Sequence, residues 1–221
     1  MLQSRMLLAH RLVPPRSPSS RPPLLLMLHG IGADEHDLLP LAPAFDPRLL
    51  VVAARAPHDE PPGYRGYEID WSVVPPRADA KEIAAARDLL ARYVEELVAE
   101  QHADPARVYL LGFSQGAIMS TTLLLSRPDL VRGVIAHSGR LSRVPGADAT
   151  AEQLAGAHAL VLHGSDDPVV PVAQGRKAHE VLAGLMGDRA TWHEYPGLGH
   201  GISDESLSAA VKWVEARLGD V

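Results

Sequence analysis

Short apolar runs alternate with longer amphipathic segments along most of the chain. Several of the runs have the length of a strand and contain no polar residue, which is typical of parallel strands buried on both faces of a sheet. This pattern predicts strands at 24–28, 49–53, 107–111, 133–136, 159–162 and 191–195. The last of these alternates in character, so we expect it nearer the edge of the sheet.

The amphipathic segments repeat apolar residues at the spacing of a helix. Apolar residues recur on one face of the segment from Asp79 to His102, and the same period continues in three later segments. Helices are therefore predicted at 79–102, 115–126, 172–186 and 203–218, with Ser203 as an N-cap and Gly219 as a stop signal. Alternating strands and helices predict an α/β fold whose mostly parallel central sheet carries helices on both faces.

Two segments follow neither period. Residues 54–78 contain several prolines and the aromatics Tyr64, Tyr67 and Trp71. Because a long loop inside a compact domain usually has a function, we expect it to form a wall of the active site. Residues 14–23 are rich in Pro, Ser and Arg and indicate an extended approach to the fold. We therefore expect a lead-in segment at 1–23 and a single domain at 24–221.

Composition and charge exclude several classes of protein. The chain has 221 residues, of which 46% are hydrophobic, and its formal net charge is −6. It has no apolar run of the ~20 residues that span a membrane, and no basic block that would bind nucleic acid. It has no cysteine, which excludes disulfides, thiolate metal sites and a Cys nucleophile. Since no secretory signal is evident, we expect a cytoplasmic location.

The chemistry is indicated first by the sequence Gly112-Phe-Ser-Gln-Gly116, between a predicted strand and a predicted helix. In a nucleophile elbow, the serine lies on a tight, strained turn, so the residues two positions away must lack bulk. Gly112 and Gly116 meet that demand and make Ser114 a candidate nucleophile. The pattern alone is also compatible with an ordinary strand-to-helix turn.

Four stretches together resemble the phospholipase/carboxylesterase family of α/β hydrolases, which includes acyl-protein thioesterases and small bacterial carboxylesterases. They are Leu28–Gly32, Gly112–Ala117, His163–Pro171 and Tyr195–His200, and they occur in the family's order. The resemblance implies an α/β-hydrolase fold and serine ester hydrolysis, which requires no cofactor and no metal.

The resemblance also assigns the remaining members of a catalytic triad. α/β hydrolases place the serine, the acid and the histidine in that order along the chain. Either Asp166 or Asp167 follows a predicted strand at the right place, and the family pattern favours Asp167, directly before Pro168. Of the 11 histidines, His200 alone lies in the loop after the last strand. No spacing of these histidines predicts a metal site.

These residues imply a mechanism. His200 would take the proton of Ser114 as the hydroxyl attacks an acyl carbonyl, and Asp167 would hold the imidazole in its tautomer. The oxyanion would be bound by the backbone N–H of Gln115 and, as the resemblance implies, by that of Ile31.

The sequence leaves the substrate open. Residues 139–150 leave no room for a cap domain, so we expect an open site. The candidate walls of the acyl pocket, which could equally pack only the loops, are Tyr67, Trp71, Leu141 and Val144. We expect a carboxylesterase for short-to-medium acyl esters or thioesters. The alternatives are a lysophospholipase, an acyl-protein thioesterase, or a non-catalytic ligand-binding module of the same fold. The substrate is expected to be a small ester, and a homodimer is compatible with the sequence although no motif specifies one.

Overall fold

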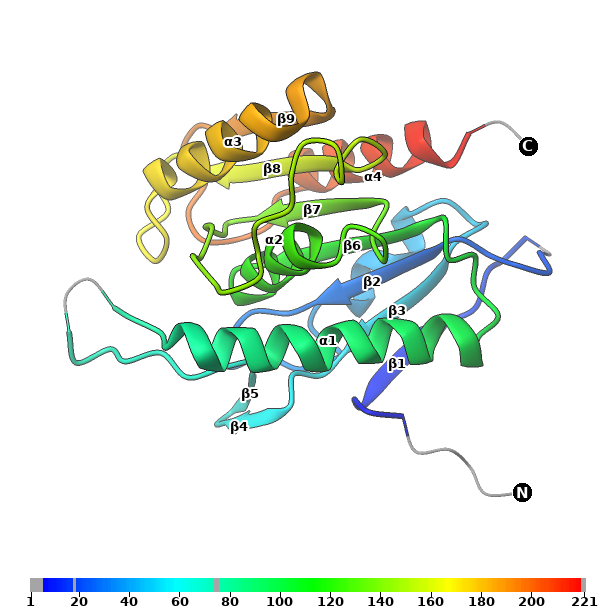
Figure 1. The fold of residues 1–221 in the computed structure, drawn as a ribbon, viewed down its shortest axis with the longest axis horizontal. Helices are drawn as coiled ribbons and strands as arrows, with labels where there is room; N and C mark the ends of the chain where they lie inside the picture. Colours follow the sequence, from blue (N-terminus) through cyan, green and yellow to red (C-terminus); the bar gives the residue numbers. More distant parts are fainter. Residues whose placement is uncertain (1–5, 18, 74–75, 220–221) are drawn as a thin grey trace.

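A seven-stranded sheet forms the centre of the computed structural model, which describes residues 6–17, 19–73 and 76–219 (Figure 1). Its strands are β1 (His10–Val13), β2 (Leu24–Leu28), β3 (Leu50–Ala54), β6 (Val108–Phe113), β7 (Gly133–His137), β8 (His158–Gly164) and β9 (Ala190–Tyr195). They lie in the order β1-β3-β2-β6-β7-β8-β9. β1 is antiparallel to β3 and all other neighbours are parallel.

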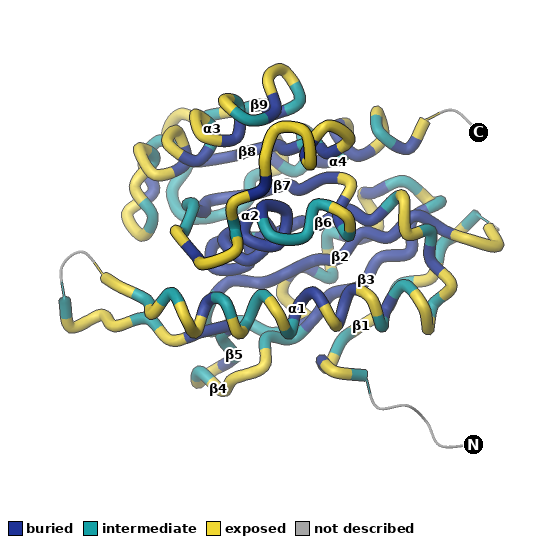
Figure 2. Tube along the Cα trace, viewed as in Figure 1, coloured by how far each residue is buried: buried dark blue, intermediate teal, exposed yellow. Residues whose placement is uncertain are grey.

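Helices cover both faces of the sheet, as the sequence predicts. They are α1 (Ala80–Glu100), α2 (Gln115–Ser126), α3 (Val172–Met186) and α4 (Asp204–Leu218), with short 3-10 helices η1 (Leu39–Ala44) and η2 (Gly187–Arg189). Successive strand side chains point to opposite faces. Leu24 and Leu26 therefore pack with α1, α2 and α3, whereas Leu25 and Met27 pack with η1 and α4. The inner strands of the sheet are buried along most of their length, α2 is buried, and the outer faces of α1, α3 and α4 are exposed (Figure 2).

The predicted elements agree with the structure to within a residue or two, and α2 and α3 agree at both ends. Ser203 is the N-cap of α4, and its hydroxyl accepts the N–H of Ser206 at 3.1 Å. The edge strand β1 was not predicted, and it lies inside the segment expected to be only a lead-in. Its four residues are half-buried or exposed. Such a strand shows no apolar run, so it becomes visible only through its pairing with β3.

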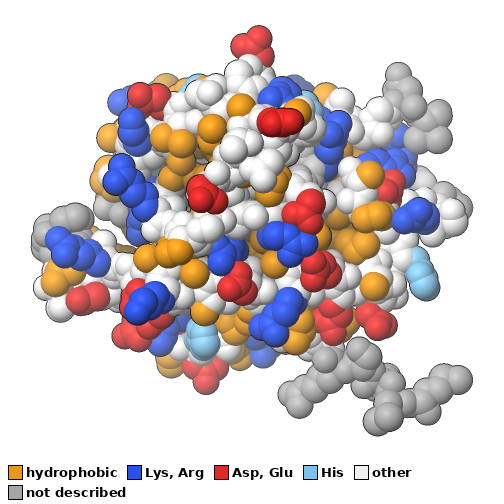
Figure 3. All heavy atoms as spheres, in the orientation of Figure 1, with side chains coloured by type: hydrophobic (Ala, Val, Ile, Leu, Met, Phe, Trp, Pro, Cys, Tyr) orange, Lys and Arg blue, Asp and Glu red, His pale blue; other side chains and the backbone are white. Residues whose placement is uncertain are grey.

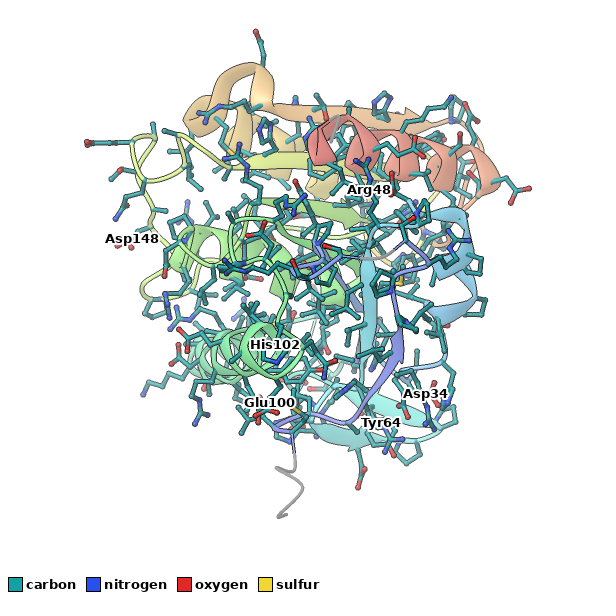
Figure 4. The ribbon with its side chains drawn as sticks, turned by 90° about the vertical axis from the view of Figure 1, so that its right-hand side faces the viewer. Asp34, Arg48, Tyr64, Glu100, His102 and Asp148 are labelled. Atoms are coloured by element: carbon teal, nitrogen blue, oxygen red, sulfur yellow. The ribbon has the colours of Figure 1, made fainter. Side chains whose placement is uncertain are left out.

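The segment at 54–78 is more ordered than its composition indicates. It contains a hairpin of β4 (His58–Glu60) and β5 (Gly63–Arg65). Tyr64 pairs with the backbone of Ala33, which brings Tyr64 and Asp34 to neighbouring segments (Figure 4). The hairpin is thus fixed against the loop that follows β2.

Among the residues that the structure describes, no cap covers the end of the sheet where the parallel strands terminate. Residues 138–157, all of them described, form only turns and irregular segments between β7 and β8. This agrees with the prediction of a fold without a cap domain. In the described part of the chain, no helix has the length and apolar character that crossing a membrane requires.

Candidate active site

Ser114 lies on the strained turn between β6 and α2. Its φ is 53°, a left-handed conformation that a non-glycine residue rarely adopts. A Cβ on Gly112 would lie 2.2 Å from the carbonyl oxygen of Gly116, and one on Gly116 would lie 2.0 Å from that of Leu28. Both positions therefore require glycine, which is the packing that a nucleophile elbow needs.

Asp167 is held by hydrogen bonds to both of its carboxylate oxygens. Oδ1 accepts the backbone N–H groups of Val169 at 2.9 Å and Val170 at 2.8 Å. Oδ2 lies 2.7 Å from Nδ1 of His200. Burial raises the pKa of Asp167, but the bonds from His200 and from the two backbone N–H groups outweigh it, and the pKa lies below its usual value. Asp167 is thus an anion that accepts from the imidazole.

The neighbouring Asp166 has a different role. It is exposed, and its Oδ1 accepts the hydroxyl proton of Ser165 at 2.5 Å. Buried His163 instead supports Asp167: its Nε2 donates to the carbonyl of Val170 at 2.8 Å and lies 3.3 Å from Oδ2 of Asp167. Between the two candidate acids, the geometry thus favours Asp167.

His200 lies in the loop between β9 and α4, beside the elbow. Its ring packs against that of Phe113, the residue before Ser114, with 4.9 Å between ring centroids. His137 also approaches this region, but it is buried and its ring nitrogens lie 2.9 Å from Oγ of Ser206 and 3.0 Å from Oγ of Ser138. Burial lowers the pKa of His137 to about 3, so it stays neutral. Of these two histidines, His200 is the one that contacts Asp167.

Two backbone N–H groups are available to bind an oxyanion. Within the described chain, no acceptor pairs with the N–H of Ile31 or of Gln115. Gln115 is the first residue of α2, where N–H groups have no partner inside the helix. Ile31, Ser114 and Gln115 line the same cavity, which has a volume of about 390 Å³. The predicted donors and the candidate nucleophile thus face one space.

The side chain of Gln115 has a further role that the sequence did not reveal. Its Oε1 accepts the N–H of Gly66 at 2.6 Å, and its Nε2 donates to the carbonyl of Tyr67 at 3.0 Å. This buried amide joins the start of α2 to the segment at 54–78. In the sequence, the one indication of this contact is the presence of a Gln directly after Ser114.

The cavity walls differ in part from those expected. The segment at 54–78 does contribute to the lining, through Ile69, Trp71, Pro76, Arg77 and Ala78. Later loops and α3 contribute Arg140, Val169, Val170, Pro171 and Gln174. Trp71, of which 56% is exposed, lines the cavity as expected. The expectation for the other three candidates was wrong. Tyr67 and Val144 are buried in the core, Leu141 packs against it, and none of the three lines the cavity.

In the described chain, one group of side chains has a spacing compatible with a metal ion: Asp34, Glu35 and His36. Its donor atoms are already engaged. Arg55 binds both carboxylate oxygens of Glu35, at 2.6 and 2.7 Å, and lowers the pKa of Glu35 to about 2. Nε2 of His36 accepts from Arg11 at 3.0 Å. The group is therefore an ion-pair cluster.

The sheet order, the elbow and the order of serine, acid and histidine define an α/β hydrolase. Residues 10–218 match the model of the phospholipase/carboxylesterase family. The chain is 29% identical over 196 residues to esterase YpfH of Escherichia coli K12, covering 85% of this chain and 80% of that protein. It is 32% identical over 121 residues to acyl-protein thioesterase 1 of Gibberella zeae, covering 52% and 49%. The crystal structure of esterase PE8 has a TM-score of 0.79 and 29% identity, covering 95% of this chain and 98% of the other. The chain belongs to the phospholipase/carboxylesterase family, whose members hydrolyse carboxylic esters.

Proposed function

We propose that this protein hydrolyses short-to-medium acyl esters and thioesters through a triad of Ser114, His200 and Asp167. The observation that carries the proposal is the 2.7 Å contact from Asp167 Oδ2 to His200 Nδ1, next to a serine in a strained elbow. An ordinary strand-to-helix turn does not require a carboxylate–imidazole pair beside its serine, whereas a catalytic triad does.

The mechanism follows from the protonation states. The Asp167 anion accepts Nδ1–H of His200, which leaves Nε2 as the basic nitrogen. His200 takes the proton of Ser114 while Oγ attacks the acyl carbonyl, and returns it to the leaving alcohol or thiol. The N–H groups of Ile31 and Gln115 stabilise the oxyanion, and each such donor is worth roughly 3–4 kcal/mol. Water then hydrolyses the acyl-enzyme with the same proton transfers in reverse.

The shape of the site supports small substrates. The cavity of about 390 Å³ is at the lower end of the range for small-molecule sites, and residues 138–157 place no helix over it. The relatives named esterase are similar along most of this chain, whereas the thioesterase of Gibberella zeae matches about half of it. Lysophospholipids and acylated proteins are therefore the second candidate.

Labelling with a fluorophosphonate tests the nucleophile, with Ser114→Ala as the control. We expect wild-type protein to gain one adduct on Ser114 and the variant to gain none. Folded wild-type protein that does not label would instead identify a ligand-binding module. A series of oxygen esters and thioesters of increasing acyl length then tests the substrate class. A maximum in kcat/KM at long acyl chains would favour the second candidate.

A further inference from the structure

The cavity beside Ser114 carries positive charge and no negative charge. Its lining residues include Arg77 and Arg140 and no Asp or Glu. The chain as a whole has a net charge of −6, and acidic and basic side chains are intermixed on the face shown in Figure 3. The cavity therefore departs from the charge of the protein around it.

Neither arginine is neutralised by an ion pair. Within the described chain, no carboxylate lies within 4.0 Å of either guanidinium group, although eight other arginines have such a partner. Arg140 is half-buried and donates only to its own loop, at 3.0 Å to Oγ of Ser142 and 3.4 Å to the carbonyl of Leu141. Most of its donors remain unused.

Arg77 has an acidic neighbour that is already occupied. The backbones of Arg77 and Asp70 pair with each other across the loop. The carboxylate of Asp70 accepts the N–H of Ser72 at 2.9 Å and its hydroxyl at 2.5 Å. Within the part of the chain that the structure describes, the Arg77 side chain makes no hydrogen bond or ion pair, and Arg77 lines the cavity.

We propose that Arg77 and Arg140 form an anion-binding subsite, so that the preferred substrates are esters carrying a carboxylate. This inference rests on the proposed function and names the substrate class of the same site. A planar guanidinium group binds a carboxylate through two parallel hydrogen bonds, and these are about twice as strong as bonds between neutral groups. Cations in a cleft with apolar walls also raise the local concentration of anionic ligands.

The apolar part of the cavity lining indicates which group links the carboxylate to the ester bond of the substrate. Apolar side chains line the same cavity as the arginines and Ser114; they are Ile69, Trp71, Ile118 and Val169. Apolar side chains favour methylene groups and give a carboxylate no partner. The structure therefore favours an ester in which a short carbon chain separates the carboxylate from the ester bond.

Two matched pairs of esters test the subsite. In the first pair the charge is on the acyl side: p-nitrophenyl hydrogen adipate against p-nitrophenyl hexanoate. In the second it is on the alcohol side: 4-carboxyphenyl hexanoate against 4-carbamoylphenyl hexanoate. We expect kcat/KM for the charged ester to exceed that of its neutral partner by about tenfold in at least one pair. Because both arginines are accessible to solvent, 0.5 M salt should reduce this ratio.

Variants assign the preference to the two arginines. Arg140→Gln and Arg77→Gln should each lower the ratio of charged to neutral kcat/KM by about tenfold, and Arg140→Lys should retain part of it. Arg143→Gln is the matched control, because Arg143 is exposed in the same loop as Arg140 but does not line the cavity. It should leave the ratio unchanged. Thermal unfolding verifies that each variant is folded.

Two results would overturn the subsite: a ratio of one or less in both pairs, or a ratio that neither arginine variant changes. In both cases the esters are still hydrolysed, so the catalytic assignment stands. If the proposed function itself is wrong, neither member of either pair is hydrolysed above the buffer rate and Ser114 does not label. The two failures are therefore distinct.

Discussion

Replacing Asp167 by Asn should abolish most of the activity through the tautomer of His200. Oδ1 of Asp167 accepts two backbone N–H groups, from Val169 and Val170. The carbonyl oxygen of an Asn must take this position, since an NH₂ group there would face two donors. The NH₂ group of the Asn then occupies the Oδ2 position and faces Nδ1 of His200, which lies 2.7 Å from it.

This orientation of the Asn amide sets the size of the expected loss in kcat. Two donors cannot face each other at that distance, so His200 must lose the proton on Nδ1 and carry it on Nε2. The nitrogen that should accept the proton of Ser114 is then blocked. The loss expected in kcat is about 10⁴-fold, or roughly 5 kcal/mol in the activation free energy.

The assay is hydrolysis of p-nitrophenyl butyrate under saturating substrate, with thermal unfolding to verify the fold. Asp166→Asn is the matched control, because the exposed Asp166 contacts Ser165 and has no bond to His200. It should retain most of the turnover. If Asp167→Asn keeps a tenth of the wild-type kcat, or if Asp166→Asn is the inactive variant, the acid is wrongly assigned and the argument from the amide orientation fails.

Three further predictions test the elbow, the buried histidine and the absence of a metal requirement. Gly116→Ala should lower the free energy of unfolding by about 2 kcal/mol, because its Cβ would lie 2.0 Å from the Leu28 carbonyl oxygen. The control Gly184→Ala, whose Cβ meets no atom within 4 Å, should not destabilise the protein, and equal values for the two variants in urea denaturation would contradict the packing argument. Burial lowers the pKa of His137 from 6.5 to about 3, so the unfolded chain binds a proton that the folded protein excludes. His137 alone should therefore lower the free energy of unfolding by about 2 kcal/mol between pH 7 and pH 5, and an unchanged free energy of unfolding over this interval would count against it. EDTA should leave kcat/KM unchanged, and activity that is lost with EDTA and restored by zinc would indicate a metal centre.

The sequence by itself determined the parallel strands, the four α-helices, the elbow and the order of the candidate catalytic residues. β2 is a run of five apolar residues buried on both faces, so its pattern depends only on its own composition. Gly112 is fixed by the tight turn around Ser114, because a Cβ on it would meet the backbone of Gly116, and this is a local constraint on the backbone. Local constraints of this kind can be read from a sequence because the residues that impose them are adjacent.

The tertiary structure decided everything that depends on contacts between distant segments. Asp166 and Asp167 are chemically the same, and only the fold places one of them against His200. Strand β1 has no apolar pattern and exists through its pairing with β3. Tyr67 and Trp71 are both aromatic residues of one loop, but their environments differ. The amide of Gln115 binds the backbone of Tyr67, and the Tyr67 side chain is buried, whereas Trp71 is exposed and lines the cavity. The convergence of Arg77 and Arg140 has the same origin, because a sequence gives the charges of two loops but not the space that they share.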